Sequence, residues 1–415
     1  MTESAPLSEE KKQSRTLARL LKDFLDTEAS GGIIMMFVAL LAIVTANLNG
    51  FDAIYHDFIY TPISINFGDI ALNLPLKKFV KDVFMVAFFL LVGLELKREM
   101  LEGFLSQKGQ KLLPAIAALG GIVLPALIYY VMNMHEPAYL KGWAIPTATD
   151  IAFAVGVLAI VGRSMPPSAK IFLLAIAIYD DLAAIVIVAL FYGNGFNVEY
   201  VPVVLFLIGT LFMINRLKIS YLTPYFFLCG FLGIFLYKTG LHSTIAGVIT
   251  ALFIPIRLEE GSSKSPLGTA MHYLHPWVSY FILPLFAFVS AGIVLKGLSI
   301  ENFFDTVPLG IILALFLGKQ LGIMGLTFLA VKLKIADKPQ GAGWLQLYAI
   351  SALAGIGFTM SLFIGLLAFS DPILQAELKI GVIVGSLLST ILAVILIQIS
   401  KKYAVAPEAT QEATQ

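Results

Sequence analysis

Residues 171–191 read IFLLAIAIYDDLAAIVIVALF, an apolar segment interrupted only by two adjacent aspartates at its middle. A helix needs about 20 apolar residues to cross the hydrocarbon layer of a membrane, and this segment has that length. It therefore predicts a membrane-spanning helix with Asp180 and Asp181 near its centre. Ionisable residues at that depth are rare and usually functional.

The whole chain has the composition of a polytopic membrane protein. Of its 415 residues, 58% are apolar and only 13% are charged, and the mean hydropathy is +0.87. A soluble domain carries about 25% charged residues, so this composition disfavours a soluble enzyme, a disordered protein and a nucleic-acid binder. The net charge of +1 gives no strong field to attract an acidic partner, and the single Cys229 cannot form an internal disulfide.

Apolar runs between polar or Gly/Pro breaks predict an all-α fold with twelve spans in one transmembrane domain, residues 29–400. The expected spans cover residues 30–48, 82–103, 112–133, 143–163, 168–192, 200–215, 222–237, 241–255, 276–297, 307–331, 344–369 and 377–399. Residues 1–28 combine basic side chains with leucines at helical spacing, which is typical of an amphipathic helix on the cytoplasmic membrane surface. Residues 401–415 are expected to form a cytoplasmic tail.

The basic residues predict the orientation of the chain. Most of the 28 Lys and Arg residues fall in the loops on the same side as the N-terminus. Because cytoplasmic loops carry an excess of Lys and Arg, both termini are predicted to be cytoplasmic, with an even number of spans between them.

One external loop has the pattern of a β-hairpin, over residues 62–75. Apolar and polar residues alternate on both sides of Gly68-Asp69, and Gly at the first turn position permits a two-residue hairpin turn. A lone hairpin is marginally stable in water, so pairing with the same hairpin of a second subunit would stabilise it. An irregular loop is the alternative interpretation.

Four ionisable residues fall deep within expected spans: Asp150, Asp180, Asp181 and Lys319. Each costs roughly 2.5–3.5 kcal/mol at the centre of a spanning helix. Adjacent helical residues point about 100° apart, so one of the two neighbouring aspartates could line a cavity while the other pairs with Lys319. The alternative is a pair of buried carboxylates that only fixes helix packing.

Two expected spans are interrupted near their middles. In Ala144-Ile145-Pro146-Thr147-Ala148-Thr149-Asp150, the proline removes a backbone donor and clashes with the preceding turn. The second interruption is Gly355-Ile356-Gly357. These breaks occupy corresponding middle spans of two three-span units, residues 112–192 and 307–399, which predicts an inverted repeat with a site near the membrane midplane. Asp150 and Lys319 have the right signs to balance the exposed helix ends. Close helix packing is the alternative explanation of the glycines.

These residue types suit the exchange of a cation for protons. Hard cations prefer oxygen ligands, which carboxylates, Thr hydroxyls and freed carbonyls supply. Burial away from water also favours the protonated form of a carboxyl group. A site that holds either a proton or Na+ or Li+, but not both, couples the two fluxes by competition.

Several motifs together resemble the NhaA family of sodium/proton antiporters, over about residues 15–400. They are AIPTATDIAF at 144–153, the pair Asp180-Asp181, Gly318-Lys319, GIGFTMS at 355–361, FLLVGLELKRE at 89–99 and HYLHPW at 272–277. This family is itself a standard example of an inverted repeat built with broken helices. The resemblance implies twelve helices, with helices 4 and 11 broken and crossing.

The resemblance also implies roles for residues. Asp181 would be the main ligand of the Na+ or Li+ ion and the proton carrier, with Asp180 beside it in the metal site. Asp150 and Thr149 would belong to the crossed region, whose broken backbone includes Pro146, Gly355 and Gly357, and Lys319 would pair with Asp180. The residues matching the cytoplasmic funnel and the pH response are Asp82, Glu95, Arg98, Glu99, His242, His272 and His275.

Members of the family exchange sodium for a larger number of protons across the bacterial inner membrane, with pH regulation and often as homodimers joined by the external hairpin. The resemblance implies no cofactor and no enzymatic activity, and its partners are the transported ions and membrane lipid. The chain departs from the family pattern at Met271, where an acidic residue is expected, and at Gly268 and Thr269, where basic residues are expected. These departures affect the expected pH set-point.

Simpler interpretations exist for some of these residues. His272 and His275 could be solvated loop residues, and Glu95 to Glu99 could be a charged helix end stabilised by pairs three and four residues apart. Among other functions, an intramembrane aspartyl protease would share Tyr179-Asp180, but the second motif, Gly-x-Gly-Asp in another span, is absent. A channel would need rings of pore-lining residues, which the sequence does not repeat. A proton-coupled exchanger of another small ion is the nearest alternative.

Overall fold

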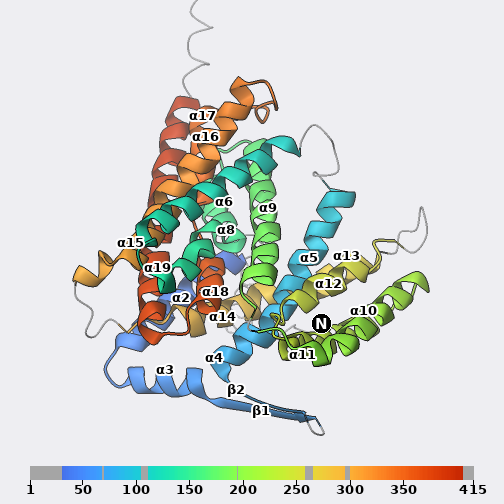
Figure 1. Ribbon diagram of the computed structural model, residues 1–415. Coiled ribbons are helices and arrows are strands. Elements are labelled where there is room, and N and C mark those ends of the chain that lie inside the picture. Colours follow the sequence, from blue (N-terminus) through green and yellow to red (C-terminus); the bar gives the residue numbers. More distant parts are fainter. Residues whose placement is uncertain are drawn as a thin grey trace, which may run out of the picture.

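The computed structural model describes residues 30–67, 70–103, 111–193, 195–257, 265–294 and 300–404. These residues form a mostly helical molecule with one small sheet (Figure 1). The expected N-terminal segment 1–28 and residues 405–415 of the expected tail lie outside the described residues, as does the Gly68-Asp69 turn.

Seven helices in the described part of the chain are long and apolar enough to cross a membrane. They are Ser30–Asn47 (α2), Leu112–Asn133 (α6), Pro167–Phe191 (α9), Val198–Arg216 (ending in α10, Val201–Arg216), Pro266–Ala291, Thr306–Lys332 and Pro372–Lys401 (within α19, Pro372–Ala404). Two of these are composite. Pro266–Ala291 consists of Pro266–Trp277 (α13), Val278–Ile282 (η5) and Leu283–Ala291 (α14). Thr306–Lys332 consists of Thr306–Leu313 (α15), Ala314–Gly318 (η7) and Lys319–Lys332 (α16). The number in the described part of the chain rises to nine if each of two bent helix pairs is counted as one span.

Three further expected spans correspond to helices that do not pass this test of length and composition, so the number twelve stays a prediction. One is the continuous helix formed by Leu76–Phe79 (α4), Val80–Phe84 (η1) and Met85–Leu101 (α5), which has charged residues near both ends. The others, Thr223–Thr239 (α11) and Ile245–Phe253 (α12), are short and are separated by a turn.

Several expected boundaries were wrong, and two of them concern predicted site residues. The helix expected to start at residue 82 begins at Leu76, and the one expected to start at 276 begins at Pro266. His272 and His275 are therefore helical rather than loop residues. At the first boundary, the lysines indicate a loop by their charge, but a long Lys side chain can lie on a helix and extend its ammonium to a polar partner. At the second, Pro276 is accommodated next to the π-helical η5, which re-forms the hydrogen bonds around it.

The two interrupted segments are bent and touch each other. Pro137–Leu140 (α7) and the 3-10 helix Lys141–Thr147 (η3) make an angle of 42° with Ile151–Val161 (α8). Trp344–Leu353 (α17) and Phe358–Ala368 (α18) also make an angle of 42°. The Asp150 backbone N–H donates to the Ile356 carbonyl at 2.7 Å, so the two breaks are joined directly.

The predicted hairpin is confirmed. Pro62–Phe67 (β1) pairs antiparallel with Ile70–Pro75 (β2), in a register that runs from Pro62 opposite Pro75 to Phe67 opposite Ile70. The hairpin and the short helix Phe51–Tyr60 (α3) lie at one end of the molecule (Figure 1). Tyr55 fixes α3 by donating to the Phe288 carbonyl at 2.8 Å.

The helices divide into two groups by their packing. The first group contains α2 to α5 and α10 to α14, and the second contains α6 to α9 and α15 to α19. Within the second group, α6 packs on α15, α16 and α9, while α19 packs on α15, α17 and α18. This second group contains both predicted repeat units, and the two groups meet where α2 contacts α8 and α14 contacts α18.

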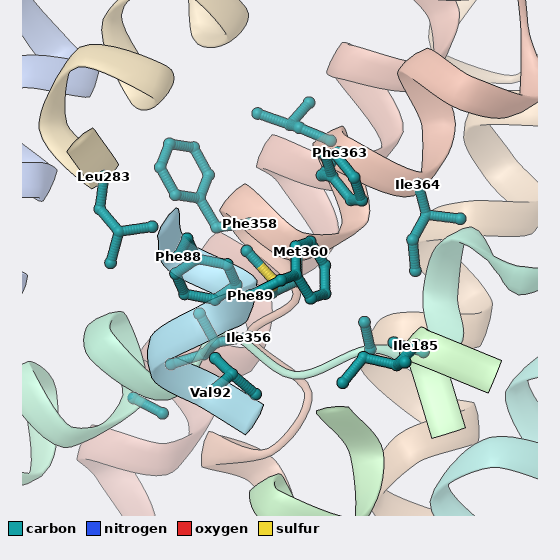
Figure 2. Close-up of a cluster of buried hydrophobic side chains, with 14 of the residues drawn as sticks. Phe88, Phe89, Val92, Ile185, Leu283, Ile356, Phe358, Met360, Phe363 and Ile364 are labelled. Carbon is teal, nitrogen blue, oxygen red and sulfur yellow. The ribbon is translucent and has the colours of Figure 1, made fainter. Parts of the chain in front are cut away.

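Buried apolar side chains fill part of the space between the groups (Figure 2). Phe88 and Phe89 come from α5, and Phe358, Phe363 and Ile364 come from α18. Phe89 and Phe363 are in ring contact, with centroids 5.3 Å apart. This apolar cluster lies beside the two breaks, where the ionisable residues gather.

Candidate functional site

Asp150 joins the beginnings of two helices. Its Oδ1 accepts a hydrogen bond from the Phe153 backbone N–H at 3.0 Å, at the start of α8. Its Oδ2 accepts from the Thr359 backbone N–H at 2.9 Å and from the Thr359 hydroxyl at 2.5 Å, at the start of α18. Because helix N-termini carry partial positive charge, one buried carboxylate here satisfies and stabilises both.

Lys319 and Asp180 form a buried ion pair that extends to the first break. Lys319 is the first residue of α16, directly after the π-helical η7, and its ammonium donates to Asp180 Oδ2 at 2.5 Å and to Thr149 Oγ1 at 3.0 Å. Thr149 Oγ1 also lies 2.6 Å from Asp180 Oδ2 and 2.8 Å from the Ala354 carbonyl. A hydroxyl has one proton, so Thr149 donates to only one of these two acceptors at a time.

Asp181 lies in a different environment from Asp180, as the 100° separation of helix neighbours predicts. It is buried, yet it lines a cavity of about 610 Å³. Among the described residues, it forms no salt bridge, and no hydrogen bond reaches its carboxylate. Asp150 and Thr359 line the same cavity, so its wall combines oxygen atoms from three elements of the second helix group.

The first helix group supplies the opposite wall of the cavity. Glu95, Arg98 and Glu99 on α5 and His275 on α13 line it, which places three predicted funnel residues and one predicted pH-response residue around one space. Arg98 and Glu99 are 3.5 Å apart. The cavity thus lies between the two helix groups, with Asp181 on one side and a row of charged side chains on the other.

The structure places three other predicted residues elsewhere. Asp82 and His242 lie outside the lining of this cavity and contact each other, with Oδ1 and Nε2 3.7 Å apart. Asp82 precedes Glu95 on the same continuous helix by about 20 Å, given a rise of 1.5 Å per residue. His272 is exposed on α13 and is also absent from the cavity lining.

The glycines of the second break are in close contact with other helices. A Cβ added at Gly355 would lie 2.6 Å from Ser389 Oγ and 2.7 Å from the Leu315 carbonyl. One added at Gly357 would lie 2.9 Å from Leu315 Cδ2. Close packing therefore explains why both residues are glycines, and both also lie in the break between α17 and α18. Pro146 is buried within η3.

Sequence reasoning gave no role to Thr359, although it quoted the motif that contains it. Its hydroxyl and its backbone N–H both bind Asp150, and it lines the cavity next to Met360. The sequence signal for Thr359 is its position two residues after Gly357. A polar residue at a buried helix start usually forms a hydrogen bond with a specific partner.

In the described part of the chain, no three His, Cys, Asp or Glu side chains are grouped closely enough to hold a metal ion. Carboxylate and hydroxyl oxygens are the ligands that hard cations such as Na+ prefer.

Comparison with known proteins agrees with the resemblance seen in the motifs. A sequence model of the family described as Na+/H+ antiporter 1 matches residues 22–397. A protein named Na(+)/H(+) antiporter NhaA from Brucella melitensis biotype 1 is 45% identical over 392 residues, which cover 94% of this chain and 52% of that protein. The chain thus spans about half the length of that relative.

Two other relatives are matched over nearly their whole length. The protein named Na(+)/H(+) antiporter NhaA from Brucella ovis is 45% identical over 389 residues, 93% of this chain and 97% of that protein. The one named Na(+)/H(+) antiporter NhaA 2 from Saccharophagus degradans is 46% identical over 379 residues, 90% and 98% respectively. These names describe transporters and not proteases. The chain belongs to the Na+/H+ antiporter 1 family, whose members here are NhaA sodium/proton antiporters.

Proposed function

We propose that this protein is a secondary transporter that exchanges Na+ or Li+ for protons across the bacterial inner membrane. One observation carries the proposal: Asp181 lines the cavity between the two helix groups, while its neighbour Asp180 is paired with Lys319. Asp181 therefore has the freedom to bind and release an ion, and Asp180 and Lys319 hold the surrounding charges in place. The proposed transport needs no cofactor besides the ions themselves.

Coupling would come from competition at Asp181. A proton and a cation both neutralise a carboxylate, and a buried carboxylate strongly favours having one or the other. Asp180, Thr149 and the carbonyls of the breaks would complete the oxygen ligands. Movement of one helix group against the other would then expose the site to alternate sides of the membrane. The joined breaks, with Asp150 holding both helix starts, would keep the site intact during that movement.

The same proposal includes the finer expectations from the sequence. The chain would have twelve spans and an inverted repeat, with both termini and the cavity mouth on the cytoplasmic side. Exchange would be electrogenic. Four residues at the cavity would take part in its pH response: Glu95, Arg98, Glu99 and His275. Three residues at other positions would also contribute: Asp82, His242 and His272. The hairpin of residues 62–75 would join two copies in a dimer surrounded by lipid.

The experiment is exchange in everted membrane vesicles, with a dye that reports the pH gradient. Addition of Na+ or Li+ should collapse the gradient in vesicles that contain the protein, and Asp181→Asn should abolish the response. Asp57→Asn is the matched control, because that carboxylate is exposed on α3. Normal exchange by Asp181→Asn would contradict the proposed role of Asp181. A response to K+ as strong as that to Na+ would contradict the cation assignment.

A further inference from the structure

Three lysines at the hairpin end of the molecule connect the two helix groups. Lys77 on α4 donates to Gln375 Oε1 on α19 at 3.2 Å. Lys81, one turn later, lies 3.5 Å from the Leu366 carbonyl of α18. Lys379, one turn after Gln375, donates to the carbonyl of Gly292, which follows α14, at 2.6 Å. Each of the three bonds crosses from one helix group to the other.

The electrostatics of these lysines differ from those of a permanent ion-pair network. Within the described part of the chain, neither Lys77 nor Lys379 forms a salt bridge, and Lys81 lies 3.7 Å from Asp82, which His242 also contacts. The acceptors are an amide and two carbonyls, of which Leu366 is in the last turn of α18 and Gly292 directly follows α14. Helix C-termini carry partial negative charge, which attracts the ammonium groups.

Such bonds are suited to being broken and re-formed. A hydrogen bond from an ammonium group to a neutral acceptor can be exchanged for one to water at a small net cost when the groups separate, whereas separation of a buried ion pair leaves an uncompensated charge. The two kinds of contact are placed differently in this molecule. The buried pair Lys319–Asp180 lies within the second group, and the lysine contacts lie between the groups.

The lysine contacts lie on the opposite side of the apolar cluster from the cavity. Lys81 and Glu95 are on the same continuous helix, roughly 21 Å apart along its axis. On α18, Phe358 is next to the Asp150 site and Leu366 is at the lysine end, with Phe363 and Ile364 of the apolar cluster between them (Figure 2). Figure 1 shows α4, α14 and α18 gathered near the hairpin end.

We propose that Lys77, Lys81 and Lys379 form a lysine latch that closes the hairpin side of the ion site. The latch holds α4 and α14 against α18 and α19 while the cavity on the other side is open, and it must release before Asp181 can be reached from the hairpin side. This inference rests on the proposed transport function, because only an alternating site requires such a release.

The first test measures accessibility and needs no transport. A reporter cysteine replaces Ile364, which is buried in the apolar cluster, in a background where Cys229, the only native cysteine, is changed to Ser. Intact cells, or vesicles with the hairpin side outward, are treated with a membrane-impermeant maleimide. Because loss of even one net hydrogen bond can shift an equilibrium about tenfold, the K77M/K81M/K379M variant should label at least about tenfold faster than the background.

Lys78→Met is the matched control for this measurement. Lys78 is on the same helix, but its ammonium lies over the Tyr237 ring of α11, within the first helix group. Its labelling rate should equal that of the background. If the triple variant labels no faster than Lys78→Met, the lysine contacts do not hold this side closed and the proposal is wrong.

The second test locks the latch. Lys77→Cys and Gln375→Cys are joined by a short bifunctional methanethiosulfonate that a reductant cleaves. Cross-linked protein should lose Na+/H+ exchange in vesicles, and the reductant should restore it. A control pair within one group, Lys78→Cys with Tyr237→Cys, should exchange before and after cross-linking. Full exchange by the cross-linked Lys77/Gln375 pair would overturn the latch.

The two tests also separate failure of the latch from failure of the proposed function. If reduced protein with the Lys77/Gln375 cysteines and the control pair both fail to exchange Na+, the transport proposal is at fault. The maleimide labelling rates still decide whether the three lysines keep the hairpin side closed.

Discussion

Lys319 and Asp180 form a salt bridge, with Nζ 2.5 Å from Oδ2, in which neither side chain is exposed at all. The pair joins α16 to α9 inside the second helix group, and Thr149 connects it to the first break. Asp180 Oδ1 has no partner among the described residues, so one oxygen of this buried carboxylate remains open. The pair is therefore both a packing element and a neighbour of Asp181, where we propose that the ion binds.

Removal of one member of this pair should destabilise the protein strongly. Lys319→Met leaves the Asp180 charge buried without its partner, and breaking a buried pair in this way costs about 3–5 kcal/mol. The double variant Lys319→Met/Asp180→Asn removes both charges and should recover most of the loss. The measurement is the thermal unfolding midpoint of purified protein in detergent. A single variant as stable as the parent would show that the pair contributes little to the fold.

Asp181→Asn should abolish exchange with little loss of stability. In the described residues no hydrogen bond reaches the Asp181 carboxylate, so the amide leaves no former partner unsatisfied. Its thermal midpoint should stay near that of the parent, whereas Asp180→Asn, which leaves Lys319 buried and unpaired, should unfold at a clearly lower temperature. Equal destabilisation by the two substitutions would contradict the different roles assigned to these neighbours.

Competition at one site should appear in the pH dependence of transport. If a proton and Na+ exclude each other at Asp181, acidification should raise the Na+ concentration needed for half-maximal exchange, by up to about tenfold per pH unit where the site is mostly protonated. Saturating Na+ should largely restore the rate. The check is a series of Na+ titrations in vesicles at several pH values. A half-saturating concentration that does not change with pH would exclude a shared site.

Helix packing between α6 and α16 depends on a reciprocal glycine contact. A Cβ added at Gly322 would clash with the Gly120 carbonyl, and one added at Gly120 would clash with the Gly322 carbonyl. Gly322→Val should therefore lower the free energy of unfolding by about 1–3 kcal/mol. Gly325→Ala, on the same helix with open space around its Cβ position, should not destabilise. Thermal unfolding of both variants gives the comparison, and equal effects would mean that the contact is not restrictive.

Much of the membrane fold could be predicted from the sequence because apolar length and local breakers leave a strong pattern. The span expected at 112–133 coincides with α6, and the span expected at 168–192 differs from α9 by one residue at each end. The hairpin was predicted from alternation and Gly68. The predicted boundaries were wrong where a charged residue or a proline continues a helix, as at Lys77 and Pro276. Tertiary contacts allow such residues within a helix at these positions.

The sequence predicted which residues belong to the candidate site better than it predicted how those residues are arranged. Depth in an apolar run singled out Asp150, Asp180, Asp181 and Lys319. The sign of their charges predicted that one of the two adjacent aspartates pairs with Lys319, and the family resemblance named Asp180 as that partner. Which residues share the cavity depends on how α5 lies against the second group, and sequence spacing does not encode that. The family resemblance places Asp82 with Glu95 in one funnel, yet the two residues are near opposite ends of one helix and only Glu95 lines the cavity. The function of each residue remains a prediction.

The hydrogen bond between the Thr359 hydroxyl and Asp150 should contribute measurably to the joining of the two breaks. Thr359→Val keeps the shape of the side chain and the backbone N–H but removes the hydroxyl donor from a buried carboxylate, which costs about 1–3 kcal/mol. Thr359→Ser keeps the donor and should lie close to the parent. Thermal unfolding and vesicle exchange are measured on both variants. Because Asp150 balances the starts of α8 and α18, we expect Thr359→Val to lower thermal stability before it affects exchange. A Val variant as stable as the Ser variant would show that the two backbone N–H groups suffice to hold Asp150.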